Sequence, residues 1–103
     1  DGGGILSVQP DIKLPPQNFR LFQNYPNPFN PTTCIGFAIP KTTKVELSIY
    51  DMLGRKVATP MDKWLPAGRH EVEWNAASYS SGIYFYELTA GKYRAVQRML
   101  LIK

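Results

Sequence analysis

The sequence contains a single cysteine, Cys34, and a single histidine, His70, among its 103 residues. One cysteine cannot form an intramolecular disulfide, so the stability of the fold has to come from packing. One cysteine and one histidine also cannot supply the ligand set of an ordinary zinc site. We therefore predict a domain that needs no metal and no cofactor, in which Cys34 is a half-buried strand residue.

Long apolar runs and catalytic motifs are missing as well. No stretch of the chain approaches the about 20 apolar residues that a transmembrane helix needs, so we predict no membrane insertion. The N-terminal glycines lack the spacing of a phosphate-binding loop, and no nucleophile elbow is present. Glu71 and Glu73 alternate with core positions of one strand, and nothing in the sequence predicts a cleft around them. We expect no enzymatic activity.

Acidic residues are fewer than basic ones, which gives a formal net charge of +4. The excess lies in residues 92–103, which contain Lys92, Arg94, Arg98 and Lys103 and no acidic residue. Nucleic-acid binding requires a basic patch with aromatic or helical partners, and cations strung along one strand-like tail form only a weak patch. We interpret them as a solvated strand face and predict no nucleic-acid partner.

The length and composition of the chain predict one folded domain. With 44% hydrophobic and 13% aromatic residues, the sequence has enough apolar side chains for a core and is not of the disordered type. Residues 1–18 are rich in glycine and proline, as linkers are, so we place the folded domain at residues 19–103. Because the chain begins with Asp1 and not with Met, we expect the linker to lead to an upstream domain of the same chain.

The first half of the domain has the pattern of a β-hairpin protein. Residues 32–39 and 44–50 alternate apolar and polar side chains, which is typical of strands with one buried face. Residues 51–54 predict a tight turn with Gly54 at positive φ, and residues 55–59 begin the returning strand.

The second half continues with strands. The turn at residues 66–68 precedes a strand that directs Trp74 to the core. The aromatic strand at residues 83–88 is apolar on both faces, which is typical of a central strand covered on both sides. A turn at residues 91–92 leads into the final strand, residues 93–103. Strands spaced about 8–12 residues apart without a helix predict an all-β fold, a small antiparallel immunoglobulin- or fibronectin III-like sandwich of about seven strands.

A proline-rich stretch, LFQNYPNPFNPTT, stands at residues 21–33. Proline disfavours a helical conformation of the residue before it and lacks the N–H group that a central strand needs. We predict that the stretch runs along a sheet edge, packs Tyr25 and Phe29 against the core margin, and protects that edge from other chains. The residues of this structural motif, called the proline motif below, are Tyr25, Pro26, Asn27, Pro28, Phe29, Asn30 and Pro31.

The aromatic residues leave one binding function open. Trp64 lies near a turn and is a candidate for exposure, and sandwich domains often bind sugars through exposed aromatic rings. An alternative function is therefore a fibronectin-like accessory domain of an extracellular enzyme, which binds polysaccharide or spaces domains.

Five motifs carry a resemblance to a known family. In chain order they are LFQNYPNPFNPTTCIGFAIP, VELSIYDMLGRKV, LPAGRHEVEWN, SSGIYFYELTAG and RMLLIK. Together they resemble the type A C-terminal sorting domain of type IX secretion substrates, over residues 19–103. The sandwich is also similar to the immunoglobulin-like domain of the flagellar hook-capping protein, so a flagellar assembly domain is a further alternative.

The resemblance implies a non-enzymatic C-terminal secretion and sorting module. Proteins of this family cross the inner membrane with a signal peptide, and the outer-membrane type IX translocon recognises their C-terminal domain in the periplasm. The cargo then reaches the cell surface or the medium, and a sortase-like peptidase often removes the domain, here within or upstream of residues 1–18. The implied partners are thus the upstream cargo domain, the translocon and the peptidase, and we expect a monomer.

The resemblance also implies which residues the translocon recognises. The last strand is a candidate for strand addition to a receptor, and it fits equally well a buried strand whose loss unfolds the domain. Carried onto this sequence, the residues are Gly54, Arg55, Gly68, Gly82, Arg98, Met99, Leu100, Leu101, Ile102 and Lys103.

Overall fold

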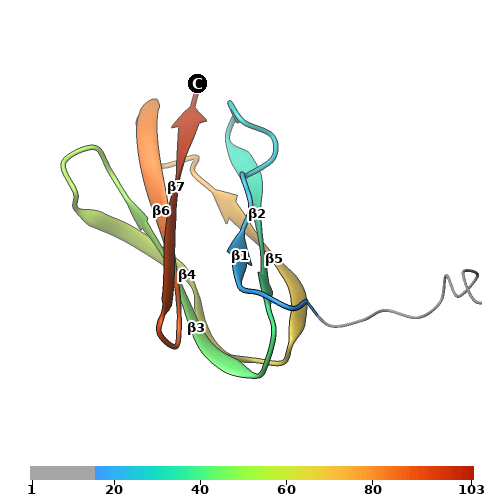
Figure 1. Ribbon diagram of the computed structural model, residues 1–103. Helices are drawn as coiled ribbons and strands as arrows, with labels where there is room; N and C mark the ends of the chain where they lie inside the picture. Colours follow the sequence, from blue (N-terminus) through green and yellow to red (C-terminus); the bar gives the residue numbers. More distant parts are fainter. Residues whose placement is uncertain (1–15) are drawn as a thin grey trace, which may run out of the picture.

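The computed structural model describes residues 16–103, which form two packed antiparallel sheets (Figure 1). The three-stranded sheet has the order β1-β2-β5, and the four-stranded sheet has the order β4-β3-β6-β7. This confirms the predicted all-β sandwich of seven strands. Most of the predicted linker, residues 1–15, lies outside the described residues. The strands are β1 (Arg20–Leu21), β2 (Thr32–Ile39), β3 (Thr43–Tyr50), β4 (Lys56–Leu65), β5 (Gly68–Asn75), β6 (Gly82–Ala90) and β7 (Tyr93–Leu101).

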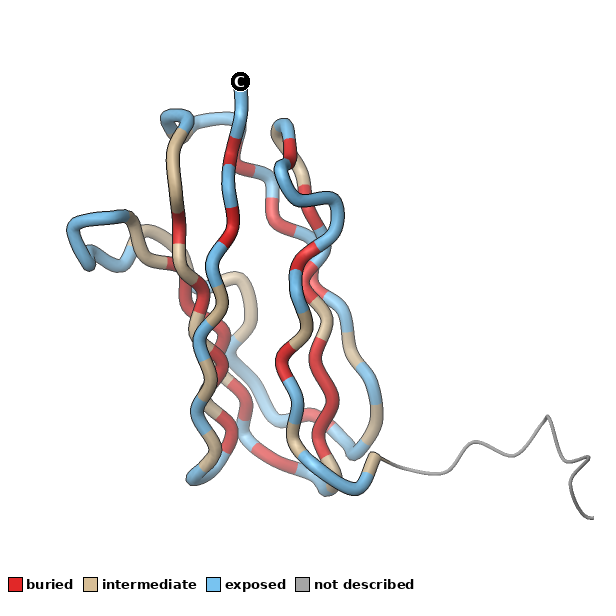
Figure 2. Tube along the Cα trace, turned by 45° about the horizontal axis from the view of Figure 1, so that its top comes forward, coloured by how far each residue is buried: buried red, intermediate tan, exposed pale blue. Residues whose placement is uncertain are grey.

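The core lies between the sheets and follows the alternation of the sequence. Buried and exposed residues alternate along much of the strands (Figure 2), and the buried hydrophobic side chains of both sheets form one core cluster. In β2 and β3 the fully buried side chains are those of the predicted inner faces, and Trp74 of β5 is buried as predicted. The largest members of the core on these strands are Ile35, Phe37, Ile39, Val45, Leu47, Ile49 and Trp74.

The two hairpin turns form where the sequence predicts them. Gly54 has a φ of 82° and Gly91 a φ of 61°, a region in which a residue with a Cβ atom is strained. In the β3–β4 turn the carboxylate of Asp51 also accepts the N–H groups of Leu53 and Arg55, at 2.9 and 3.0 Å. These local contacts stabilise the turn.

The connection at residues 66–68 differs from the predicted turn. It carries the chain from β4 in one sheet to β5 in the other, so it is a crossover between layers and not a hairpin. β4 begins as predicted and contains a β-bulge, because Leu47 pairs with Met61 and Ile49 pairs with Ala58. Residues 16–103 contain no helix, and hence none that is long and apolar enough to cross a membrane.

The prediction that residues 83–88 are covered on both sides is wrong. β6 is central in its sheet, but only its inner side chains, such as Tyr86, are buried, whereas Ile83 and Phe85 are partly exposed. The fold has two layers, so each sheet keeps one face toward solvent. The same reason makes the prediction for Cys34 wrong, since its thiol lies exposed on the outer face of the three-stranded sheet.

Candidate functional site

The two ends of the folded domain lie side by side. Residues 19–29, called the incoming segment below, run parallel to β7, and Phe29 forms a parallel bridge with Leu101 (Figure 1). At the start of β7 the ring of Phe19 stacks on that of Tyr93, with the ring centroids 5.0 Å apart. The proline motif and the end of β7 therefore form one structure, although they are far apart in the sequence.

Phe29 pairs with the end of β7 through two backbone hydrogen bonds. Its N–H donates to the carbonyl of Leu100 at 3.0 Å, and its carbonyl accepts the N–H of Ile102 at 2.9 Å. The Phe29 side chain is buried and lies 6.0 Å from Trp74 between ring centroids, as predicted for the core margin. An aromatic ring in the core thus anchors the backbone that covers the end of β7.

Side chains of the incoming segment cover more of the same edge. The N–H of Leu100 donates to Oδ1 of Asn27 at 3.0 Å, and Nε2 of Gln23 donates to the carbonyl of Arg98 at 2.8 Å. The Leu100 N–H and the Arg98 carbonyl point away from β6, because the odd-numbered residues of β7 form the hydrogen bonds to β6. The edge from the Arg98 carbonyl to Ile102 is therefore occupied, which confirms that the proline-rich stretch protects an edge. Strand addition to a receptor at these residues would require the incoming segment to leave.

The prediction that Tyr25 packs at the core margin is wrong, because its side chain is 81% exposed. The backbone of Tyr25 pairs with Cys34 through two hydrogen bonds of 2.9 Å, which directs both side chains outward. The neighbouring Asn24 takes the inner position instead. Its Nδ2 donates to Oγ1 of buried Thr33 at 3.0 Å, so the polar side chain is satisfied in the core.

Lys103 is bound by the loop between β5 and β6. Its Nζ donates to the carbonyls of Ala77 and Tyr79, at 2.5 and 2.8 Å, and its N–H donates to Oγ of Ser81 at 2.9 Å. A cation that satisfies two carbonyl groups holds that loop against the end of β7. The family resemblance implies a recognition role for Lys103, and no sequence pattern predicts this internal role.

The structure brings most of the predicted recognition residues to one end of the sandwich. A shallow hollow of about 270 Å³ between the β3–β4 turn and the start of β6 is lined by Arg55 and Gly82, and Gly82 pairs with Leu101 of β7. Arg55 also pairs with Asp51, Nε to Oδ2 at 2.8 Å, and hydrogen bonds from Arg55 lower the pKa of that carboxyl group. Gly68 pairs with Ile39 at the opposite end of the domain and stays apart from the others.

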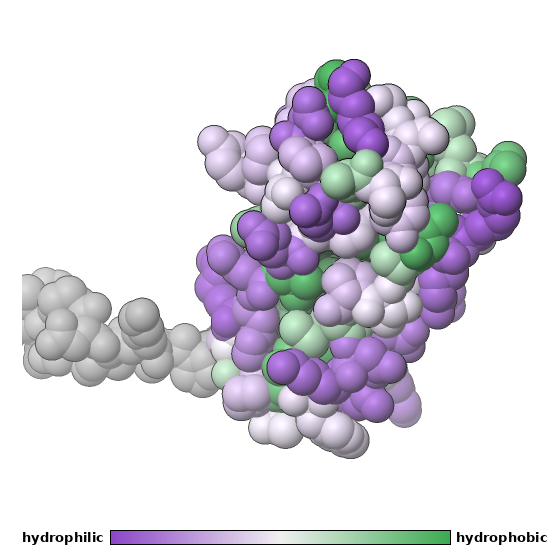
Figure 3. Space-filling view, turned by 180° about the vertical axis from the view of Figure 1, so that it is seen from behind, coloured by the Kyte–Doolittle hydropathy of each residue, from purple (hydrophilic) through white to green (hydrophobic). Residues whose placement is uncertain are grey.

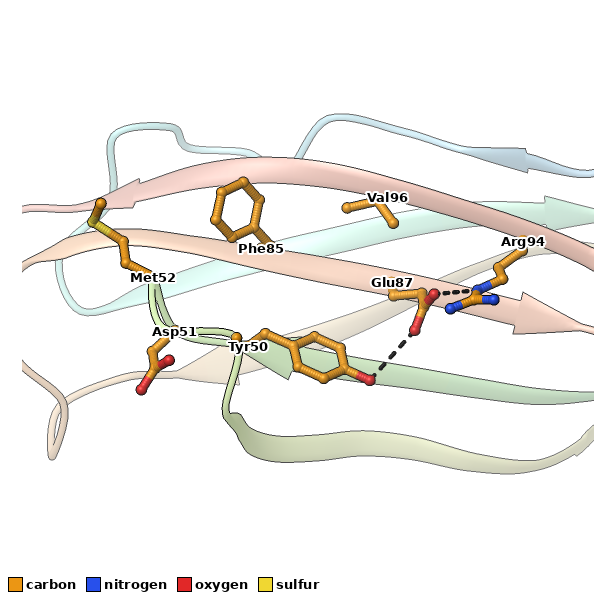
Figure 4. A pocket seen from close by; sticks show the side chains of 8 residues that line it. Tyr50, Asp51, Met52, Phe85, Glu87, Arg94 and Val96 are labelled. Carbon is orange, nitrogen blue, oxygen red and sulfur yellow. Dashed lines mark hydrogen bonds and ion pairs between the residues drawn. The ribbon is translucent and has the colours of Figure 1, made fainter.

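The outer face of the four-stranded sheet carries a second hollow, of about 370 Å³ (Figure 4). Glu87 lies at one end of it, accepts the hydroxyl of Tyr50 at 3.3 Å and forms an ion pair with Arg94. Met52 and Phe85 lie at the other end, and Val96 lies opposite Glu87 in the β6–β7 ladder. Sequence reasoning missed these apolar residues, and the signal that could have found them is the apolar character of the outer positions of β6.

The alternative of a sugar-binding domain gains little from the geometry. Trp64 is exposed, as anticipated, but among residues 16–103 it makes no aromatic pair. Seen from behind, hydrophilic residues cover much of the surface and hydrophobic ones stand in small groups (Figure 3). Within residues 16–103, no three His, Cys, Asp or Glu side chains cluster as a metal site would require.

The structure is thus a small sandwich in which the two ends of the folded domain are hydrogen-bonded to each other. Comparison with known proteins defines it further, because residues 23–103 match the family described as "Secretion system C-terminal sorting domain". The chain belongs to this family. It is a sorting signal of the type IX secretion system, attached to a protein that is secreted or displayed at the cell surface.

Solved structures agree with the fold. The dimeric latent PorU from Porphyromonas gingivalis matches with a TM-score of 0.65 and 16% identity, over 80% of this chain and 9% of that one. PorZ, an essential surface component of the type IX secretion system of the same species, matches with a TM-score of 0.58 and 24% identity, over 81% of this chain and 11% of that one. This chain therefore spans only a small part of each protein. No curated protein matches it.

Proposed function

We propose that this domain carries an upstream cargo protein from the periplasm through the outer-membrane type IX translocon, and that it does so as a non-catalytic monomer. The translocon recognises the end of the sandwich where the incoming segment contacts the end of β7. A sortase-like peptidase then cleaves within or upstream of residues 1–18. The predicted recognition residues at this end are Gly54, Arg55, Gly82, Arg98, Met99, Leu100, Leu101, Ile102 and Lys103.

The observation that carries the proposal is the contact between the incoming segment and the end of β7. The proline motif and RMLLIK are the two motifs that most specifically resemble the sorting family, and they form one hydrogen-bonded edge. A receptor that recognises this edge meets it only in a folded domain. Recognition of this edge by the receptor therefore requires a folded domain.

The alternation of β7 divides its last residues between two roles. Met99 and Leu101 are buried, so they serve the fold, whereas Arg98, Leu100 and Ile102 point outward and are available to a receptor. We therefore assign the two interpretations of the terminal strand, direct recognition and structural support, to alternate residues. Gly68, at the far end, is assigned to the fold and not to recognition.

The test is a secretion assay with the full chain fused behind an exported fluorescent cargo, in cells that have type IX machinery. We expect the fusion to reach the surface or medium and the cargo alone to stay in the periplasm. Met99→Ala should lose secretion through unfolding, because truncating a buried Met costs about 2–5 kcal/mol. Ile102→Ser should reduce secretion while the free energy of unfolding changes by less than about 0.5 kcal/mol. Retention of the wild-type fusion in the periplasm would contradict the proposal.

A further inference from the structure

Large hydrophobic side chains gather on the outer face of the four-stranded sheet, near the end that the recognition residues occupy. Leu53 and Met52 in the β3–β4 turn are 78% and 67% exposed, and Val96 and Leu100 of β7 are exposed as well. A folded domain seldom leaves large apolar side chains together in water unless something covers them. Among residues 16–103, Tyr25, Trp64 and Ile102 complete the set of exposed large hydrophobic residues.

These side chains form one surface. Leu100 pairs with Ile83 across the β6–β7 ladder, and Ile83 shares a hollow with Met52 and Leu53. Met52 in turn lines the neighbouring hollow with Phe85 and Val96 (Figure 4). The outer apolar patch is defined below as Met52, Leu53, Ile83, Phe85, Val96 and Leu100.

One cation within the patch has no partner. Glu87 is paired with Arg94, and Asp51 is paired with Arg55, so the acidic groups at the margin are already neutralised. Arg98 lies directly opposite Phe85 in the ladder and forms no ion pair with any of residues 16–103. The patch therefore presents apolar side chains around a positive charge that the domain itself leaves uncompensated.

This charge decides between possible occupants. A second copy that docked on the patch around a two-fold axis would bring Arg98 toward its own equivalent, which is unfavourable. A segment of another protein with apolar side chains around a carboxylate would bury the patch and pair with Arg98. The backbone edge is a poorer docking place, because the incoming segment already occupies it from Arg98 to Ile102.

We propose that the outer apolar patch is where a component of the type IX machinery docks, through an apolar segment whose carboxylate pairs with Arg98. The inference rests on the proposed function and adds to it the sheet face that the type IX machinery recognises and the chemistry of the partner. It also moves the main contact from the edge of β7 to the sheet face beside it.

The experiment uses the full chain fused to the fluorescent cargo and changes the patch in two independent ways. Leu53→Ser combined with Leu100→Ser removes apolar contact, and Arg98→Glu reverses the charge. We expect each to lower secretion about tenfold or more, the effect of losing about 1.4 kcal/mol of docking energy. Arg98→Lys keeps the charge and should retain most of the secretion. Equal urea midpoints for all fusions show that folding is unchanged.

Matched controls lie on β4 of the same sheet, outside the patch. Trp64→Ser removes an exposed apolar side chain, and Lys63→Glu makes the same change of charge as Arg98→Glu. Both should be secreted like the wild type. Suppressors that restore secretion of Arg98→Glu should replace an acidic residue of an outer-membrane component with Lys or Arg.

The outcomes separate this inference from the proposed function. If the patch variants are secreted normally while removal of residues 98–103 stops secretion, the patch is not read, and the sorting function stands. If the wild-type fusion itself is retained in the periplasm, both the inference and the proposed function are contradicted. Analytical ultracentrifugation should show a monomer, and a dimer that Leu53→Ser with Leu100→Ser abolishes would overturn the inference in favour of a second copy.

Discussion

The two outer edges of the four-stranded sheet are protected in different ways. The edge of β7 is covered by the incoming segment, through contacts such as Asn27 to Leu100 that join residues 73 positions apart. Among residues 16–103 no strand pairs with the outer edge of β4, although the Val57 carbonyl of β4 accepts the hydroxyl of Tyr79 at 2.9 Å. A bulge beside Pro60 and the charged Lys63 disfavour pairing with strands of other molecules. Local sequence thus protects the β4 edge, whereas protection of the β7 edge requires the whole domain to have folded. A receptor could therefore distinguish a folded from an unfolded domain only at the β7 edge.

The largest effect should come from Phe29→Ala, which removes the anchor of the covered edge. Phe29 is almost fully buried beside Trp74, so we expect a loss of about 3–5 kcal/mol in the free energy of unfolding. Urea denaturation followed by tryptophan fluorescence measures it. The matched variant on the other edge, Trp64→Ala, should change stability by less than about 0.5 kcal/mol, measured by circular dichroism. Equal effects of the two variants would show that the covered edge has no special dependence on packing.

Tyr86 gives the covered edge a dependence on pH. Its hydroxyl donates to the carbonyl of Phe22 at 2.7 Å and so ties the incoming segment to β6. Burial raises the pKa of Tyr86 from 10.0 to about 12. Above pH 10 the unfolded chain gives up this proton and the folded domain keeps it, so stability falls as the pH rises from 10 toward 12.

The expected size of this loss is about 2–3 kcal/mol, from two pKa units at about 1.4 kcal/mol each. Tyr86→Phe should lower stability by about 1 kcal/mol below pH 10, because a buried hydrogen bond is lost, and should remove the contribution of Tyr86 to the alkaline loss. Urea midpoints of both proteins below pH 10 and near pH 12 measure the difference. Parallel losses in the two proteins would mean that another group causes the alkaline destabilisation.

Asn27→Ala tests the hydrogen bond from Leu100 with a smaller effect. Loss of one neutral hydrogen bond at a partly exposed site should cost about 0.5–1.5 kcal/mol. Exchange of the Leu100 amide proton, followed by NMR, should also become faster. Asn30→Ala in the same proline motif is the control, because the Asn30 side chain forms no hydrogen bond with any of residues 16–103. Identical exchange at Leu100 in the two variants would contradict the role of Asn27.

The smallest effect is expected for Tyr25→Ala. The side chain points into solvent from the outer face, so stability should change by less than about 0.5 kcal/mol. A thermal melt measures this against the wild type. A loss near that of Phe29→Ala would restore the prediction that both aromatic residues of the motif pack in the core.

The contrast between Tyr25 and Phe29 shows where sequence reasoning ends. Alternation in β2 and β3 is regular, so their inner faces and the Gly54 turn could be predicted from local pattern alone. Three prolines interrupt the alternation of the motif, and only the pairing of Tyr25 with Cys34 decides which side chain turns inward. That pairing is a tertiary contact, which no local pattern specifies.

The candidate site was predictable in part for the same reason. Motifs indicated the residues of β7, and an edge position of the proline-rich stretch followed from the chemistry of proline. Their contact with each other did not follow, nor did the loop carbonyls around the Lys103 ammonium group. The outer apolar patch combines a turn with two strands, so its members became neighbours only through the topology of the sheet.

The parallel course of the incoming segment and β7 has a mechanical consequence. The segment begins beside Tyr93, at the start of β7, and its last residue lies beside Ile102, at the far end. A force that pulls the cargo away from a held terminal strand acts along both segments in opposite directions. Such a shear load stretches the contacts between them together, whereas a load that peels strands apart breaks them one after another. The domain is therefore built to resist tension between its ends, the direction in which a tethered cargo is pulled.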